Sequence, residues 1–161
     1  MSLIARISRH FEESAQLKLA AVEHLAAPVA DAVDLMVSAL ASDRKILACG
    51  NGGSAGDAQH FAAELIGRFE RERPELAALA LTTDSSILTA VANDYSYNEV
   101  YARLVKAKGR KGDVLIGLST SGNSGNIIVA FKVAKERGMI IVGFTGATGG
   151  KMKEYCDYLI N

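Results

Sequence analysis

Short apolar runs alternate with helix-like stretches from residue 45 to the end of the chain, and this alternation constrains the fold more than any other feature. The runs lack the polar residue at every second position that a strand with one solvated face would carry, so we expect them to be buried on both faces. Buried strands that alternate with helices form parallel sheets with helices on both sides. The sequence therefore predicts an α/β fold, a three-layer αβα sandwich. The apolar runs are 46–49, 77–81, 114–118, 139–144 and 158–160.

The first 41 residues are predicted to be helical. Ile4, Ile7 and Phe11 share one face of a first helix. Pro28 suits the first turn of a second helix, where its missing N–H costs nothing. We therefore expect two N-terminal helices that serve packing or assembly, followed by the α/β core over 44–161. No linker or low-complexity segment interrupts the chain, which predicts a single domain over 1–161.

Composition limits the classes of partner. Lys plus Arg and Asp plus Glu both number 18, and this balance argues against a nucleic-acid-binding protein, which needs an excess of basic residues. No apolar stretch approaches the roughly 20 residues of a membrane span, and the charged N-terminal segment does not resemble a secretory signal. We therefore expect a cytoplasmic protein with no membrane partner. Cys49 lies in an apolar run and is predicted to be a buried thiol.

The segment Ser119–Ser124 concentrates hydroxyl and amide side chains at the predicted start of a helix. The unpaired N–H groups and partial positive charge of a helix N-terminus favour a phosphate, and Gly122 lets the backbone approach a ligand. An ordinary capped turn is the alternative, although a cap needs only one such residue. The segment favours a phosphate site.

A glycine-rich loop, 50–56, follows the first predicted strand. It has neither the lysine of a Walker-type loop nor the spacing of a dinucleotide fingerprint, so it does not indicate a nucleotide. In the helix that follows, His60 and Glu64 are four residues apart and project from one face. The pair could transfer a proton or bind a divalent metal, and the alternative is a solvated helix pair. A metal site would need further ligands.

Asn93 and Asp94 end another apolar run. Both residue types favour turns, so the residues alone predict a turn that terminates a helix. His10 and His24 lie in the predicted N-terminal helices and are interpreted as structural or surface residues.

Five separated motifs, in this order along the chain, resemble those of the phosphoheptose isomerases of the sugar isomerase (SIS) superfamily. The similarity extends over nearly the whole chain and includes 71–74 and 112–124. The motifs are Cys49–Ser54, Asp57–Phe61, Glu64, Asn93–Asp94 and Ser119–Ser124.

The resemblance implies an SIS-type, flavodoxin-like fold and an enzyme that converts sedoheptulose 7-phosphate to D-glycero-D-manno-heptose 7-phosphate for lipopolysaccharide synthesis. It implies that Glu64 is the base of an enediol proton transfer and that His60 and Glu64 hold part of a zinc site. It further implies a homotetramer, with the N-terminal helices in the assembly and the active sites near subunit boundaries. The residues implied to bind phosphate are Ser119, Thr120, Ser121 and Ser124, and those implied to contact the sugar are Asn51, Gly52, Gly53, Glu64, Asn93 and Asp94.

The chain departs from the family pattern at its end, because a C-terminal helix carrying a Gln and a His would follow Asn161 and complete the metal site. A copy without these groups is expected to bind sugar phosphate and catalyse poorly. The superfamily also includes non-catalytic members that sense phosphosugars or associate with a replication initiator. Glu64 discriminates between the two hypotheses, because an isomerase needs a positioned base and a binding protein does not.

Overall fold

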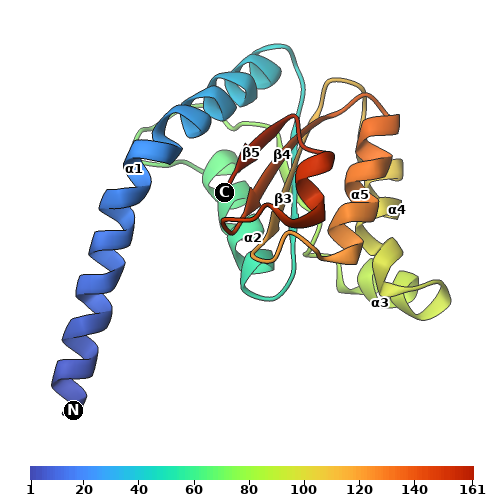
Figure 1. The fold of residues 1–161 in the computed structure, drawn as a ribbon. Helices are drawn as coiled ribbons and strands as arrows, with labels where there is room; N and C mark the ends of the chain where they lie inside the picture. Colours follow the sequence, from blue (N-terminus) through green and yellow to red (C-terminus); the bar gives the residue numbers. More distant parts are fainter.

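The computed structural model describes residues 1–161, and its centre is a five-stranded parallel sheet (Figure 1). The strand order β2-β1-β3-β4-β5 is that of flavodoxin-like sheets, in which the direction of winding reverses between β1 and β3. The predicted fold class is confirmed. The strands are β1 (Ile46–Gly50), β2 (Ala78–Ala80), β3 (Val114–Ser119), β4 (Ile140–Thr145) and β5 (Tyr158–Ile160).

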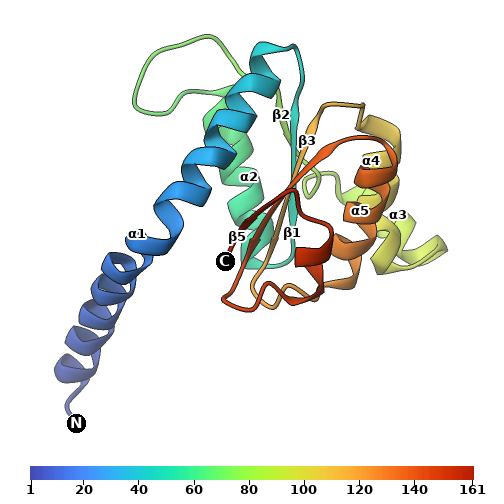
Figure 2. The same cartoon turned by 45° about the horizontal axis from the view of Figure 1, so that its top comes forward.

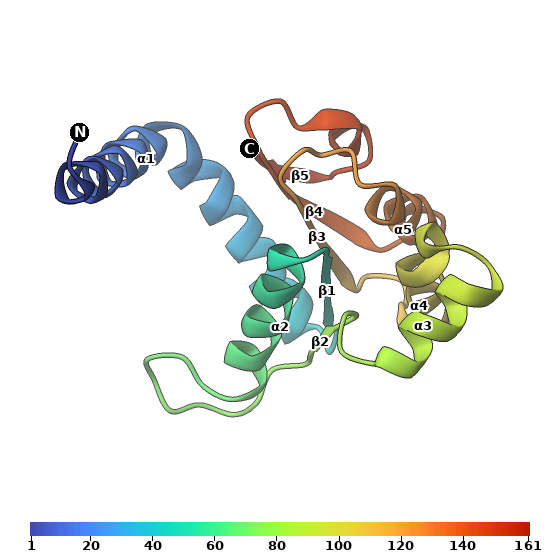
Figure 3. The ribbon, with the colours of Figure 1, turned by 90° about the horizontal axis from the view of Figure 1, so that it is seen from below.

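Helices cover both faces of the sheet (Figure 3). Helices α1 and α2 lie on one face, and α4 and α5 lie on the other with α3 beside them. This arrangement is the three-layer sandwich that the buried strands predict. The helices are α1 (Leu3–Ala41), α2 (Gly53–Ile66), α3 (Ser85–Asp94), α4 (Val100–Lys108) and α5 (Gly125–Glu136), with 3-10 turns η1 (Tyr97–Glu99) and η2 (Gly150–Glu154).

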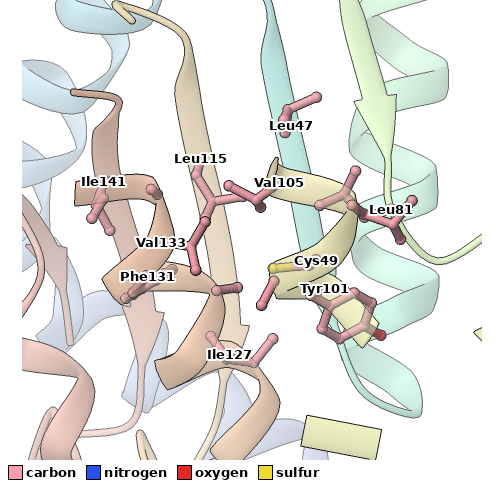
Figure 4. Packing of buried hydrophobic residues seen from close by; sticks show 14 of the residues in the cluster. Leu47, Cys49, Leu81, Tyr101, Val105, Leu115, Ile127, Phe131, Val133 and Ile141 are labelled. Carbon is pink, nitrogen blue, oxygen red and sulfur yellow. The ribbon is translucent and has the colours of Figure 1, made fainter. Parts of the chain in front are cut away.

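Each face of the sheet has its own apolar core. On the face of α4 and α5, side chains such as Tyr101 and Phe131 pack on Leu47 and Leu115 (Figure 4). On the other face, the small residues of α1 and α2 pack closely on the strands. Cys49 is fully buried, and burial raises the pKa of its thiol to about 12, so it is a core residue as predicted.

The N-terminal segment differs from the prediction of two helices, because α1 is continuous from Leu3 to Ala41 with Pro28 inside it. Proline removes one backbone hydrogen bond and bends a helix without ending it when the flanking turns hold. Figure 1 shows α1 changing direction along its length. The two predicted helices are thus two arms of one bent helix.

The N-terminal arm of α1 extends away from the body of the molecule (Figure 2). By length and mean hydropathy α1 resembles a membrane span, a weak indication that core helices also give. Its C-terminal arm packs on the sheet through Ala32 and Ala39. The N-terminal arm instead carries large apolar side chains that are two-thirds or more exposed, namely Leu3, Ile4, Phe11, Leu17 and Leu19.

Candidate active site

The strand order places two loops side by side at the point where the winding of the sheet reverses. Gly50 at the end of β1 is paired with Leu118 near the end of β3, so the loops that follow both strands leave the same edge of the sheet. Ligands of open parallel sheets bind at such a switch point, beyond the carboxyl ends of the strands. The glycine-rich loop and the hydroxyl-rich segment therefore form one site.

The hydroxyl-rich segment 119–124 forms a cradle, by which we mean the hollow of about 260 Å³ that it lines with Asn51 and Ser54. Ser119 is buried, and its Oγ lies 2.8 Å from the Oγ of Ser124. Ser124 occupies the N-cap position of α5, but its side chain does not bond to the amides of the first turn. The capped-turn alternative is therefore wrong for this residue. The amide of Ile127 donates to Oδ1 of Asn126 and that of Ile128 to the carbonyl of Ser124, so the amides of Gly125 and Asn126 are the ones left for an anion.

A second loop, 146–151, contacts the cradle at Gly122 and Asn123. Gly122 adopts a φ of +64°, and a side chain at this position would collide with the carbonyl of Gly149. The amide of Met152 donates to the carbonyl of Gly122, and the amide of Lys151 donates to Oδ1 of Asn123. The cradle is thus held in place before any ligand arrives. Glycine at position 122 is needed for both its conformation and its close contact.

Asn51 enters the cradle from the glycine-rich loop, with its side chain held by Asn126 of α5. The two amides exchange hydrogen bonds of 2.9 and 2.8 Å, and the hydroxyl of Tyr97 donates to Oδ1 of Asn51 over 3.3 Å. The sequence motifs do not include Asn126 or Tyr97, and they include Ser54 without assigning it a ligand contact. A polar residue directly before the apolar run of α5 was the available signal for Asn126.

Tyr101 fixes the end of β1 where the glycine-rich loop begins. Its hydroxyl donates to the carbonyl of Gly50 over 2.6 Å. Burial, together with the nearby Tyr97 and Cys49, raises the pKa of Tyr101, so the phenol stays protonated and keeps its donor role. This contact anchors the loop that carries Asn51.

His60 and Glu64 face a different hollow. Nε2 of His60 lies 2.9 Å from Oε1 of Glu64, as expected for residues four apart on one helix face. They line a hollow of about 590 Å³ together with apolar side chains and Arg73. The guanidinium of Arg73 donates to the backbone carbonyls of Glu64 and Leu65, which fixes the last turn of α2. The backbone under the pair is therefore fixed, but the pair is open to solvent and His60 is largely exposed.

One chain does not bring this pair to the cradle. Ser54 lies in the first turn of α2 at the cradle and Glu64 lies in the last, ten residues along the same helix. At 1.5 Å per residue this is a rise of about 15 Å. The base and the phosphate site that the sequence predicts thus belong to separate hollows of the same protomer.

Asn93 and Asp94 belong to the last turn of α3 and not to a turn after it, so the prediction of a terminating turn places the helix end too early. Both are exposed, and Asn93 donates to Asp94 over 2.9 Å. Neither lines the cradle or the hollow of His60 and Glu64. Within one chain, the structure does not bring them to the other predicted sugar contacts.

The potential metal ligands of this chain do not cluster. No group of three His, Cys, Asp or Glu side chains lies close enough together to hold an ion. His60 and Glu64 offer one imidazole and one carboxylate, both of which zinc accepts, while zinc sites usually use three or four protein ligands. The residues present fit part of a zinc site and cannot complete one.

Comparison with known proteins identifies the family of this chain. A model of the SIS domain family matches residues 9–146. The chain belongs to the SIS domain family. Among curated relatives, this SIS domain is 60% identical over 154 residues to the phosphoheptose isomerase of Dechloromonas aromatica, covering 96% of this chain and 79% of that protein. It is 55% identical over 163 residues to the phosphoheptose isomerase of Neisseria meningitidis, covering 99% of this chain and 83% of that protein.

Solved structures give the same result. The phosphoheptose isomerase of Neisseria gonorrhoeae superposes with a TM-score of 0.93 at 51% identity, covering 99% of this SIS domain and 85% of that chain. A phosphoheptose isomerase from Francisella tularensis superposes with a TM-score of 0.95 at 38% identity, with the same coverage. The SIS fold of this chain therefore resembles that of phosphoheptose isomerases over nearly its whole length.

Proposed function

We propose that this chain is an aldose–ketose isomerase that converts sedoheptulose 7-phosphate to D-glycero-D-manno-heptose 7-phosphate. The observation that carries the proposal is the braced cradle at the β1/β3 switch point, in a chain that also presents a carboxylate at Glu64. The kinship with phosphoheptose isomerases supports the choice of substrate. The product would enter the synthesis of lipopolysaccharide heptose, and because such sugar phosphates are cytoplasmic metabolites we place the protein in the cytoplasm.

In this proposal the cradle binds the phosphate. The hydroxyls of Ser119, Thr120, Ser121 and Ser124 donate to its oxygens, and the N-terminus of α5 contributes amides and a partial positive charge. Gly52 and Gly53 carry no side chain to obstruct the sugar at the start of α2. These contacts fix one end of the substrate and leave the other end free to reach a base.

Glu64 performs the proton transfer. Its carboxylate removes a proton from the first carbon of the ketose while the carbonyl oxygen at the second carbon gains one, which gives the enediol. The proton then returns to the second carbon, and the hydroxyl of the first carbon loses its proton to form the aldehyde. No net oxidant or reductant is required, because the two carbons exchange oxidation states.

His60 and Glu64 would hold a zinc ion together with ligands from outside the groups described. Zinc bound there would polarise the substrate oxygens as a Lewis acid. Without a metal, Nε2 of His60 contacts Oε1 of Glu64 directly and orients its carboxylate.

A second copy of the chain completes the site in this proposal. The rise of about 15 Å along α2 separates Glu64 from the cradle of the same protomer, so one substrate needs the cradle and the base to come from different copies. The exposed apolar residues of α1, among them Phe11 and Leu17, offer a surface that association would bury. We propose a homotetramer, in which Asn93 and Asp94 also reach a site at a subunit boundary.

Proton NMR of sedoheptulose 7-phosphate in deuterated water tests the function. The proposal expects aldose signals and deuterium at the second carbon with the wild-type protein, and neither with Glu64→Gln. Line broadening of the sugar phosphate without turnover in the wild-type protein would instead favour a non-catalytic phosphosugar-binding protein. Metal analysis after chelation, together with turnover, tests the zinc site.

A further inference from the structure

Asn126 is a buried polar residue in the apolar start of α5. It is 2% exposed, and its side chain does not line the cradle. Instead it forms two hydrogen bonds with the side chain of Asn51, which does line the cradle. Asn126 therefore does not face a ligand itself, but it binds the side chain of a residue that does. This arrangement suggests that Asn126 acts on ligand binding through Asn51.

The backbone determines which way both amides face. The backbone N–H of Ile127 donates to Oδ1 of Asn126 over 3.0 Å, and because that N–H can only donate, it fixes the oxygen of Asn126 in place. The Nδ2 of Asn126 must then face Asn51, where it meets Oδ1 over 2.8 Å. The hydroxyl of Tyr97 donates to the same oxygen.

These contacts leave Asn51 with one unused group. Its oxygen accepts from Asn126 and Tyr97, and one N–H of its Nδ2 donates to Asn126. Its second N–H forms no hydrogen bond, and Asn51 is a lining residue of the cradle. If the amide of Asn51 were turned over, it would present its carbonyl oxygen to an anion, which would repel the phosphate in place of donating to it.

We propose that Asn126 is a positioning residue of the phosphate cradle, which holds the side chain of Asn51 so that an N–H faces the anion. The inference rests on the proposed function, since it assumes that the cradle binds a phosphate. It places Asn51 at the phosphate, where the family resemblance implies a sugar contact, because Asn51 lines the same hollow as the serine hydroxyls. It adds that the affinity for phosphate depends on a residue that does not touch the ligand and acts only through Asn51.

A double-mutant cycle separates this role from a general structural one. The variants are Asn126→Ala, Asn51→Ala and the two combined, and the readout is the affinity for inorganic phosphate by calorimetry on the full chain. Each single variant should lose about tenfold, the loss of one hydrogen bond to a charged ligand. The combined variant should lose about tenfold and not a hundredfold, because Asn126 has nothing to position once Asn51 is gone.

Asn123→Ala provides the matched control. Asn123 holds Ser121 and the amide of Lys151, and the structure shows no bond between its side chain and Asn51. Its effect should therefore add to that of Asn51→Ala. If Asn126→Ala does not fold, Asn126→Ser replaces it in the same cycle, since the shorter side chain fills part of the space and does not reach Asn51.

Each outcome supports or overturns the positioning role of Asn126. Sub-additive loss in the cycle, with additive loss in the control, supports the positioning role, as does a higher KM for the sugar phosphate at unchanged kcat. Additive losses in the cycle, or wild-type affinity in Asn126→Ala, would overturn that role and leave the proposed function standing. A wild-type protein that binds no phosphate would overturn the cradle and the role of Asn126 together.

Discussion

The cradle and the His60–Glu64 pair differ in how far a single chain completes them. The cradle is bounded by strand ends, a helix N-terminus and a bracing loop, and its donors are held by contacts within the protomer. The pair sits on one turn of α2, beside a hollow that solvent can enter. The proposed phosphate site is thus complete within one chain, while the proposed catalytic site needs groups from another copy. An enzyme with this division should lose binding and turnover through different substitutions.

Glu64→Gln should abolish turnover and leave phosphate binding intact. The amide keeps the shape of the side chain but cannot accept a proton from carbon, so turnover should fall about a thousandfold, within the usual contribution of a general base. The affinity for inorganic phosphate should stay within about twofold of wild type, because Glu64 does not line the cradle and acts at the other end of the substrate.

NMR turnover and calorimetry measure the two effects of Glu64→Gln. Glu136→Gln, at the end of α5, is the matched control and should leave both unchanged. Turnover within tenfold of wild type in Glu64→Gln would show that another group is the base.

Phe11→Glu tests whether the His60–Glu64 pair needs a second copy of the chain, because it should dissociate the oligomer. Phe11 is 75% exposed on the N-terminal arm of α1, so a carboxylate there costs the folded protomer little and disfavours a buried interface. The oligomer measured by light scattering should dissociate, and turnover should fall at least tenfold with unchanged phosphate affinity. Glu12→Gln on the same arm is the control. A monomer with full turnover would mean that one chain completes the site.

The double variant Ser121→Ala, Ser124→Ala should weaken the binding of phosphate to the cradle. A hydroxyl that donates to a charged ligand contributes about 1.5–3 kcal/mol, a factor of roughly 10–150, so losing both should lower the affinity for phosphate at least about a hundredfold. The KM for the sugar phosphate should rise by a similar factor. Ser14→Ala on α1 is the control, and unchanged affinity in the double variant would rule out the cradle.

The sequence predicts the cradle well because its determinants are local. Strand, loop and helix follow one another along the chain, and parallel pairing brings the ends of β1 and β3 to one edge without any knowledge of side-chain packing. Cys49 could be placed in the core for the same reason, since it ends the apolar run 46–49.

What the sequence could not predict depends on contacts between distant segments. The reciprocal bonds of Asn51 and Asn126 join residues 75 positions apart, and no local pattern marks them as partners. The continuity of α1 through Pro28 depends on packing of its second arm against the sheet, which propensity does not report. The gap between Glu64 and the cradle follows from the length and position of α2, although the motifs alone suggest one site.

Asp113→Asn should have the smallest effect on function, because it acts at the end of the sheet opposite the cradle. Asp113 is almost fully buried and accepts from the side chain and backbone of Lys45 and from the amide of Arg110. An asparagine would turn an N–H toward one of these donors and lower the free energy of unfolding by about 2 kcal/mol. Turnover per folded molecule should not change, and the exposed Asp43→Asn is the control.

The pH dependence of stability provides a second test at Asp113. Burial by itself would raise the pKa of this carboxyl, but hydrogen bonds from Lys45 and Arg110 and the charge of Lys45 outweigh it and hold the pKa below its usual value. A carboxyl with a lowered pKa in the folded state contributes stability above its unfolded pKa of about 3.9 and loses it as the pH falls toward the folded value. Urea unfolding should therefore show a steeper acid loss in wild type than in Asp113→Asn. Parallel curves would mean that Asp113 contributes no such linkage, and a drop in phosphate affinity would mean that the two ends of the sheet are not independent.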